Sequence, residues 1–451
     1  MIAIVVFVLF LIAFAWLSMS GSAPDVSIWP ILGLCLLFAG CFAAGVYIAA
    51  ILGVLGVVTG FVFSDRPFYN FLGSIAWTTS SNYVLIALPL FLLMGELLLR
   101  SGVSAKLYKA LNLWLNRVPG GLLHTNILSC ATFSAMSGSS IATAATMGSV
   151  ALPQFEGTAY DKKVVLGSLA AGGALGSLIP PGTILIIYAL LTNTSVGGLY
   201  AAALLPALLV TALCLGVIFL HGTRNPLPQA ATRIPLRAKL KGSLGIVPTL
   251  ILIALVLGTI YGGLATPTEA AAFGVVGAAA FALIEGKLTL KTINESALAA
   301  ARNTAMVGLI LIGAFVLNYV LTSLRVPQSV AQMIGELPVP GWAIMTGIIL
   351  LYVAMGTIME GFSMVVTTIP VIFPVVMQLG YDPIWFGVMV TLLVEIALIT
   401  PPDGTVMYVL QGLRKNGPIT DIFQGVIPFV GAYMLAVLLL LLFPGLALIF
   451  E

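Results

Sequence analysis

Apolar segments long enough to cross a lipid bilayer recur along the whole sequence, and they restrict the chain to folds built from membrane-spanning helices. A spanning helix needs about 20 mostly apolar residues, and a helix pairs all of its own backbone polar groups inside lipid. Of the 451 residues, 60% are hydrophobic and 7% are charged, whereas a soluble domain carries roughly 25% charged residues. We therefore predict an all-α, polytopic membrane protein.

The segment 134–153, with the sequence SAMSGSSIATAATMGSVALP, differs from these runs because it is rich in hydroxyl groups and glycine. Polar turns at 137–140 and at 179–183 (IPPGT) would interrupt helices at depths where backbone groups find no water. Broken backbone is tolerated there only where it is buried in protein or lines a watery cavity. The pattern predicts a re-entrant hairpin over 122–155 and a broken transmembrane helix over 163–191.

The prolines of this region recur in the second half of the chain at one constant offset. The matching positions are Pro119 with Pro340, Pro153 with Pro374, and the pair Pro180-Pro181 with Pro401-Pro402. The repeat predicts a second hairpin over 341–377 and a second broken helix over 384–410. Interrupted segments in corresponding positions of two halves are typical of secondary transporters and point to the binding site.

The repeat also divides the chain into segments. We predict an extra N-terminal transmembrane helix with an outer loop at 1–28, repeat 1 at 29–220, a basic cytoplasmic linker at 221–242 and repeat 2 at 243–451. Each repeat is predicted to cross the membrane five times, and an odd number of crossings makes the two repeats inverted relative to each other.

The distribution of charge predicts the orientation. With the linker in the cytoplasm, as the positive-inside rule suggests, all lysines and arginines except Arg66 and Arg325 fall on the cytoplasmic side. The N-terminus is then cytoplasmic and the C-terminus periplasmic. Amphipathic segments at 103–117 and 326–337 precede the two hairpins and are predicted to be surface helices.

Each half is predicted to bring a hairpin tip and a broken helix together at membrane depth. Helix N-termini carry partial positive charge and free N–H groups that suit an anionic substrate, while unwound carbonyl and hydroxyl oxygens suit Na⁺. The residues predicted to bind substrate are Ser139, Ser140, Thr143, Thr183, Glu360, Ser363, Asp403 and Thr405. The residues predicted to bind Na⁺ are Ser137, Gly138, Gly176, Pro180, Gly356, Gly361, Thr400 and Pro401. The alternative is that these small residues only let membrane helices pack closely.

Acidic residues within or near spans are functional candidates, because an ionisable group at membrane depth is costly. They are Glu96, Glu269, Glu360, Glu395 and Asp403. We favour Glu360 and Asp403 because they lie at interruptions, whereas Glu96 and Glu269 have a position near the interface as an alternative. For Asp403 the alternative is a cap on the half-helix that restarts after the prolines. No lysine or arginine falls in either tip or either break, so helix ends, hydroxyls and a companion cation would hold a bound carboxylate.

Five stretches, in order along the chain, carry a resemblance to a known family. They are SGSSIATAATMGSVALP, GGALGSLIPPGTILIIY, GLATPTEAAAFG, MGTIMEGFSMVVTTIPVIFPVV and LITPPDGT. From residue 29 to the C-terminus the chain resembles the large membrane subunit (M subunit) of tripartite ATP-independent periplasmic (TRAP) transporters, in the ion-transporter superfamily. It departs from the family pattern at Glu360, where Asp is frequent, and at Asp403, where a small apolar residue is usual.

The resemblance implies an elevator-type secondary active transporter with Na⁺ as the coupling ion. It implies uptake of an organic acid, such as a C4-dicarboxylate, sialic acid or a similar carboxylate, delivered by a periplasmic substrate-binding protein (P subunit). It also implies a small partner membrane subunit (Q subunit), because we expect no further helices in this chain that could be that subunit. The implied location is the bacterial or archaeal cytoplasmic (inner) membrane, in contact with lipid.

Other function classes are alternatives to this prediction. A stand-alone cation/dicarboxylate symporter of the same superfamily would share the hairpins and broken helices, whereas a channel would not need them. An intramembrane enzyme is disfavoured because His124 and His221 form no HExxH motif and the chain has no GxSxG motif, and no nucleic-acid partner is expected. Buried hydrophobic roles, with neither a disulfide nor a metal site, are predicted for the cysteines, which lack CxxC spacing: Cys35, Cys41, Cys130 and Cys214.

Overall fold

The computed structural model describes residues 37–449 except 39, 43, 64–68, 226–234, 336–337, 403 and 415. Within these ranges every regular element is a helix, which confirms the predicted all-α class. The predictions for 1–28, for Cys35 and for Asp403 lie outside the described residues. The other cysteines are free and buried, as predicted: Cys41, Cys130 and Cys214.

The helices of the first half include the two predicted interruptions. They are α3 (Ile48–Phe63), α4 (Tyr69–Ser80), α5 (Tyr83–Ser101), α6 (Val103–Leu115), α7 (Leu122–Ser137), α8 (Ser140–Ala151), the short 3₁₀ helix η1 (Leu152–Phe155), α9 (Lys162–Gly173), α10 (Thr183–Thr192) and α11 (Val196–Arg224). The break between α7 and α8 lies at 138–139, inside the predicted hairpin range. The break between α9 and α10 is the irregular stretch 174–182.

The second half has a corresponding order of helices. They are α12 (Leu236–Ser243), α13 (Val247–Tyr261), α14 (Pro267–Ile284), α15 (Leu290–Ser323), α16 (Val326–Gly335), α17 (Gly341–Met355), α18 (Gly361–Gln378), α19 (Pro383–Ile399), α20 (Thr405–Leu413), α21 (Thr420–Leu442) and α22 (Gly445–Leu448). α17 and α18 lie in the second hairpin range, and α19 and α20 in the second broken-helix range. The predicted linker 221–242 is partly helical, because α11 continues to Arg224 and α12 begins at Leu236.

Local chemistry explains why the helices stop and restart where they do. Ser139 and Glu360 have extended backbone, and their side chains accept hydrogen bonds from the first turns of α8 and α18; such caps start a helix. In the broken helices, proline removes the backbone N–H that would continue the helix. Both proline pairs, Pro180-Pro181 and Pro401-Pro402, contain a cis peptide bond.

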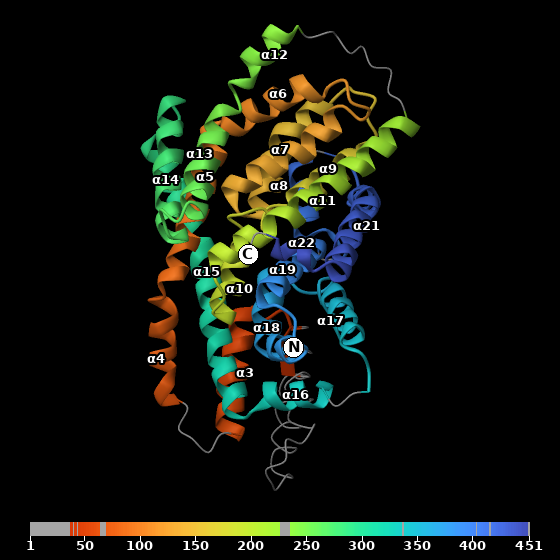
Figure 1. The fold of residues 1–451 in the computed structure, drawn as a ribbon. Coiled ribbons are helices and arrows are strands. Elements are labelled where there is room, and N and C mark those ends of the chain that lie inside the picture. The colour runs from red at the N-terminus through yellow and green to blue at the C-terminus, as the bar shows by residue number, and fades with distance from the viewer. Residues whose placement is uncertain are drawn as a thin grey trace.

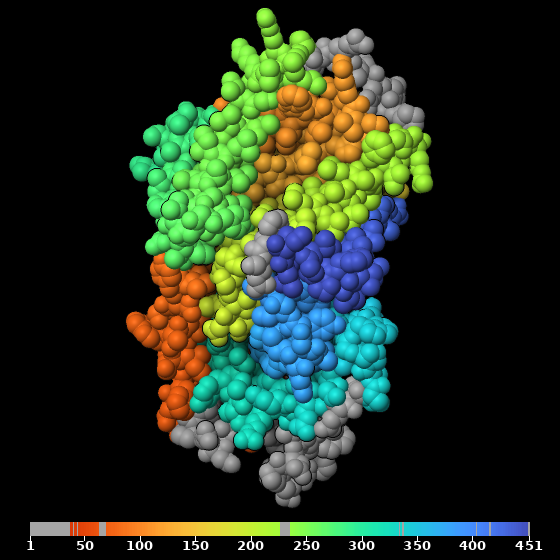
Figure 2. All heavy atoms as spheres, viewed as in Figure 1, coloured from red at the N-terminus to blue at the C-terminus, as the bar shows by residue number. Residues whose placement is uncertain are grey.

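The two hairpins lie in opposite halves of the molecule, and so do the two short amphipathic helices that precede them. α6, α7 and α8 lie in the upper half of Figure 1, whereas α16, α17 and α18 lie in the lower half. α15 packs against both α3 and α5 and runs along one side. In the space-filling view, segments from early and late in the chain meet directly along this face (Figure 2).

α19 is the central helix of the structure. Its residues from Ile384 to Ile399 are all buried, as expected for a helix that is apolar on every side. It contacts α10 and α11 from the first half and α17, α18 and α21 from the second. The hydroxyl of Tyr188 on α10 donates to the carbonyl oxygen of Pro383 at 2.6 Å. The second broken helix is therefore packed against segments of both halves.

Several helices are suited to cross a membrane. Among the described residues, six are long and apolar enough, and the bent pair α12–α13 raises the number to at most seven. They are α5, α11, α14, α15, α18 and α21. The predicted five crossings per repeat include the broken helices, and α9, α10 and α20 are each much shorter than the about 20 residues that a span needs.

Glycine lets α9 and α21 cross with their backbones in contact. A Cβ atom on Gly167 would overlap the carbonyl oxygen of Gly425, and one on Gly425 would overlap the carbonyl oxygen of Lys163. Gly431, further along α21, has open space instead. Small residues at the interfaces of membrane helices permit this close approach.

We expect Gly425→Ala to destabilise the protein, because the added methyl group forces α9 and α21 apart. Overpacking of this kind costs about 1–3 kcal/mol, although alanine itself favours a helix by up to about 1 kcal/mol relative to glycine. Gly431→Ala, on the same helix, is the matched control and should leave the stability unchanged or slightly higher. Thermal unfolding in detergent measures both variants, and equal midpoints would contradict a tight crossing.

Candidate functional site

The tip of the first hairpin lies directly on the break of the first broken helix. Gly138, which follows α7, has a φ of 61°, a left-handed conformation that favours glycine. A Cβ atom there would overlap the carbonyl oxygen of Pro181. The backbone N–H of Thr183 donates to the carbonyl oxygen of Gly138 over 3.0 Å. The break therefore satisfies a buried backbone acceptor of the tip, as burial requires.

A second close approach joins the start of α8 to the unwound stretch after α9. A Cβ atom on Gly176 would overlap the backbone of Ser140. Gly182 is equally restricted, because a Cβ atom there would overlap the carbonyl oxygen of Ser177. Gly176 and Pro180, both predicted to bind Na⁺, thus belong to a stretch that is packed against the hairpin.

Hydroxyl groups surround this contact, and one of them is unpaired. The hydroxyl oxygens of Ser137 and Thr143 lie 2.8 Å apart, and that of Ser139 accepts a hydrogen bond from the first turn of α8. Thr183 is fully buried, yet its hydroxyl oxygen has no hydrogen-bond partner within the described part of the chain. An unsatisfied buried polar group is uncommon and calls for an explanation, such as a bound ion or water.

The tip of the second hairpin packs on α19 shortly before the second break. A Cβ atom on Gly356 would lie 2.5 Å from the Cβ atom of Ala397, and one on Gly361 would lie 2.6 Å from a methyl carbon of Val394. Any side chain at these glycines would therefore push the tip away from the central helix.

Polar groups lie at both ends of this second contact. The carboxylate of Glu360 accepts hydrogen bonds from the backbone N–H and the hydroxyl of Ser363, at 3.1 and 3.2 Å. The hydroxyl of Thr400 donates back to α19 over 2.6 Å, and Pro401 follows in the break. In the first turn of α20, the hydroxyl oxygen of Thr405 is buried and, like that of Thr183, has no partner in the ranges that the structure describes.

The structure thus gathers the predicted residues into two groups. The first group joins tip and break in direct contact: Ser137, Gly138, Ser139, Ser140, Thr143, Gly176, Pro180 and Thr183. In the second group, the tip residues meet α19 and the remainder continue from its end: Gly356, Glu360, Gly361, Ser363, Thr400, Pro401 and Thr405.

A carboxylate that the sequence favours less than Glu360 and Asp403 as a functional group connects the two halves of the chain. Glu395 of α19 is fully buried. The hydroxyl oxygen of Ser140 lies 3.0 and 2.8 Å from its two carboxylate oxygens, and the backbone N–H of Ser177 donates to it over 2.9 Å. The signal in the sequence is an acidic residue inside the apolar run PIWFGVMVTLLVEIALI, but a position at an interruption favours Glu360 and Asp403 over Glu395.

Comparison with known proteins identifies the family. A model of the family described as "Tripartite ATP-independent periplasmic transporter, DctM component" matches residues 34–446.

The chain belongs to the DctM family.

This finding confirms the predicted resemblance, and individual relatives support it. The DctM-family chain is 33% identical over 398 residues to the C4-dicarboxylate TRAP transporter large permease protein DctM of Pseudomonas aeruginosa, covering 88% of this chain and 92% of that protein. It is 30% identical to the sialic acid TRAP transporter large permease protein SiaM of Vibrio cholerae, covering 91% and 94%. These relatives are permeases, which agrees with a multi-pass membrane transporter rather than an enzyme.

A solved structure supports the fold. The YdaH transporter of Alcanivorax borkumensis matches with a TM-score of 0.63 at 16% identity, covering 91% of this chain and 98% of that one. A similarity at this level of identity concerns the fold of the DctM-family chain, because one fold can host several functions.

Other candidate groups of the DctM-family chain have structural partners. Glu96 forms an ion pair with Arg100 on the same helix. Glu269 forms a capping box with Thr266 at the start of α14, which stabilises a helix N-terminus. His124 is hydrogen-bonded to a backbone carbonyl at 2.8 Å. For Glu96 and Glu269, these contacts favour structural roles over roles in binding.

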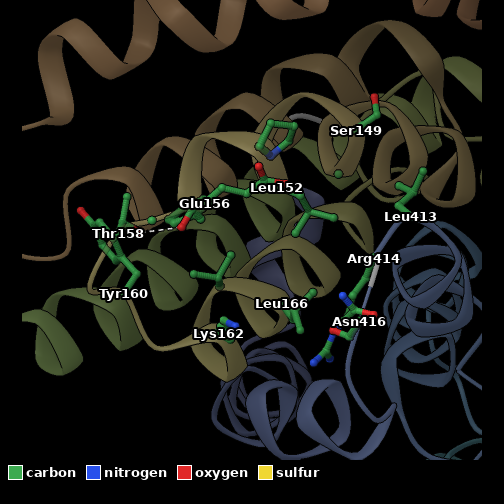
Figure 3. A pocket seen from close by; sticks show the side chains of 15 residues that line it. Ser149, Leu152, Glu156, Thr158, Tyr160, Lys162, Leu166, Leu413, Arg414 and Asn416 are labelled. Carbon is green, nitrogen blue, oxygen red and sulfur yellow. Dashed lines mark hydrogen bonds between the residues drawn. The ribbon is translucent and has the colours of Figure 1, made fainter.

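Two cavities in the described part of the chain border the ends of broken helices. One, of about 640 Å³, lies between the ends of α8 and α20 and the start of α9, where Ser149, Lys162 and Arg414 line it (Figure 3). Arg414 is paired with Asp421 at 2.6 Å. The other, of about 610 Å³, lies between α4, α10 and α15. Amide and hydroxyl groups line it, among them the side-chain amide of Asn82. Each cavity therefore adjoins one end of a half-helix.

We expect Gly138→Ala to destabilise the first tip by more than its backbone conformation alone explains. A left-handed alanine costs roughly 1–2 kcal/mol, and at Gly138 the new methyl group also overlaps Pro181. Gly157→Ala is the matched control, because Gly157 has a φ of 74° and open space around it. Thermal unfolding and uptake of the two variants are compared. An equal loss of stability would show that the contact between tip and break contributes nothing.

Proposed function

We propose that this chain is the large transmembrane subunit of a TRAP transporter that takes up an organic acid by secondary active, Na⁺-coupled transport. Membership of the DctM family supports the transporter class. The observation that supports the coupling is the first hairpin tip packed on the first break, where the buried hydroxyl of Thr183 has no partner among the described residues. The proposed substrate is a C4-dicarboxylate, sialic acid or a similar carboxylate, the classes named for its relatives.

The residues at the two breaks fit a small hard cation. Such ions prefer oxygen ligands, and unwound carbonyls with hydroxyls bind Na⁺ in transporters with broken helices. The first group offers Ser137, Gly138, Gly176, Pro180 and Thr183, and the second offers Gly356, Gly361, Thr400 and Pro401. No lysine or arginine lies in either tip or either break to compete with the ion. When bound, Na⁺ would supply positive charge beside the substrate.

The substrate carboxylate is proposed to bind at the start of α20 in the second half. Its first turn presents backbone N–H groups and the hydroxyl of Thr405, which suit an anion, whereas the N–H and hydroxyl of Ser363 at the start of α18 already donate to Glu360. The substrate would then be held without a buried arginine, and release of the cation would weaken its binding.

Transport is proposed to follow an elevator mechanism with inverted repeats. In it, the hairpins and broken helices move as one body against the remaining helices. The positions of α6 and α16 at opposite ends of the molecule support this arrangement (Figure 1), because each precedes a hairpin and could act as a hinged arm. The N-terminus would be cytoplasmic and the C-terminus periplasmic.

The proposed partners are a small membrane subunit (Q subunit) and a periplasmic substrate-binding protein (P subunit). The decisive experiment reconstitutes the chain in proteoliposomes with a small TRAP membrane subunit, with and without a periplasmic substrate-binding protein. Uptake that requires the binding protein supports a TRAP transporter, whereas equal uptake without it would identify a stand-alone symporter.

We expect uptake to require an inward Na⁺ gradient and to depend on the hydroxyl of Thr183. Thr183→Val removes the unpaired oxygen with little change in shape and should raise the Na⁺ concentration for half-maximal uptake about tenfold, which corresponds to about 1.4 kcal/mol. Thr183→Ser should behave like the wild type.

Thr211→Val is the matched control, because the hydroxyl of Thr211 is buried but already bonded within α11. The proteoliposome assay measures initial uptake over a series of Na⁺ concentrations. Uptake that persists in Na⁺-free buffer with only a pH gradient would contradict Na⁺ coupling and indicate proton coupling.

We expect a crosslink between the first tip and α5 to depend on the transport state. A Cβ atom on Gly95 would lie 3.5 Å from the Cβ atom of Ser137, within the about 3.5–4.5 Å of a disulfide. The pair Gly95→Cys and Ser137→Cys is made in a background without the native cysteines. It should crosslink less when Na⁺ and substrate change the populations of the transport states. Gly313→Cys with Leu52→Cys joins α15 to α3 at a comparable 3.3 Å and should not respond. Identical crosslinking of both pairs in all conditions would argue against an elevator.

A further inference from the structure

Glu395 is a buried carboxylate with hydrogen-bond donors but no basic partner. It is fully buried, and none of the ion pairs within the described ranges involves it. Its partners are the hydroxyl of Ser140 and both the backbone N–H and the side chain of Ser177. A carboxylate can accept about four hydrogen bonds, and a buried charge is costly unless a charge of the opposite sign accompanies it.

The position of Glu395 places it beside the proposed first cation site. Ser140 follows the tip residues Gly138 and Ser139, and Ser177 follows Gly176. The approach of Gly176 to the backbone of Ser140 brings these two stretches into contact, and the hydroxyl oxygens of Ser140 and Ser177 are 3.2 Å apart. The carboxylate from the second half therefore contacts both first-half stretches that carry the predicted Na⁺ ligands.

We propose that Glu395 is a positioning residue for the coupling cation: its negative charge, held by Ser140 and Ser177, makes the first tip and break selective for a cation. The proposal rests on the proposed Na⁺ coupling. It adds to the cation site a residue that lies outside both hairpin tips and both breaks. Since the first-half stretches contain no acidic residue, the charge at this site comes from the other half of the chain.

The proposal also changes the role of Ser140. The start of α8 carries the partial positive charge of a helix N-terminus, and Glu395 already occupies it. A substrate carboxylate at the same place would meet a like charge, which is unfavourable. Ser140, predicted to bind substrate, is therefore assigned to the protein's own carboxylate and not to the anionic substrate.

The test is Glu395→Gln, which keeps the size and a hydrogen-bond acceptor but removes the charge. Purified chain in detergent is titrated with NaCl against choline chloride at constant ionic strength, and the thermal midpoint is followed. The wild type is expected to be stabilised by Na⁺, and the variant should need at least about tenfold more Na⁺ for the same stabilisation, because one charge a few ångströms away changes ion binding by more than RT even at an effective dielectric constant of about 20.

Tyr433→Phe is the matched control for disturbed packing. The hydroxyl of Tyr433 is buried and donates to the carbonyl oxygen of Ala171 at 2.8 Å, so its loss weakens the contact between α21 and α9 without changing the charge. This variant should have a lower thermal midpoint but an unchanged Na⁺ dependence. Uptake in proteoliposomes should show the same separation between the two variants.

The outcomes distinguish the two proposals. A wild type that Na⁺ neither stabilises nor drives in uptake would overturn Na⁺ coupling and the role of Glu395 together. A wild type that responds to Na⁺, with Glu395→Gln responding equally, would overturn only the role of Glu395. Equal shifts in Glu395→Gln and Tyr433→Phe would also overturn it, because the effect would then be one of packing.

Glu395→Asp keeps the proposal testable if the glutamine variant does not fold. Aspartate retains the charge but withdraws it by one methylene group from Ser140 and Ser177. We expect the Na⁺ requirement to rise severalfold, less than for glutamine. An unchanged requirement in Glu395→Asp would overturn the proposal.

Discussion

Backbone groups at bilayer depth must find hydrogen-bond partners within the protein, and the arrangement of this chain follows from how its two breaks meet that requirement. In the first half, the backbone N–H of Thr183 donates to the carbonyl oxygen of Gly138, and the backbone N–H of Ser177 donates to the carboxylate of Glu395. The proline pairs lower the number of donors that need a partner. Because the first break finds its partners on the hairpin tip and on α19, these three segments hold together.

The two halves place a carboxylate at the helix start of each hairpin tip in different ways. At the second tip, Glu360 directly precedes α18 and caps it by accepting hydrogen bonds from Ser363. At the first tip, Ser139 is only a hydroxyl cap, and the carboxylate comes from Glu395 on the other half. An acidic group thus accepts hydrogen bonds at both helix starts, and at the first one this group comes from the other half of the chain. A repeated sequence pattern therefore does not imply two chemically equal sites.

The sequence could predict the helical class and the family, because apolar runs and ordered motifs are local properties of a chain. The bounds of the hairpins lie where glycine and proline interrupt those runs, which is also local information. The contact of Glu395 with Ser140 joins distant segments, and no periodicity encodes it. The sequence favours Asp403 as a functional residue because it adjoins the second proline pair. That Thr183 lacks a partner depends on how surrounding side chains pack, which the order of residues does not reveal.

α15 links the protein to the dimensions of the membrane. Its 34 residues make a helix of about 51 Å at 1.5 Å per residue, much longer than the about 30 Å of a hydrocarbon core. Near its start, Glu295 is paired with Arg100 of α5 at 3.5 Å, a charged contact that belongs in the headgroup layer. The charged residues Lys291, Glu295 and Arg302 all lie in this first part of α15, and the remaining residues 303–323 make about 31 Å of helix, which matches the core. The first part of α15 therefore extends beyond the hydrocarbon, and its pairing with Arg100 fixes the depth at which α5 and α15 sit in the bilayer.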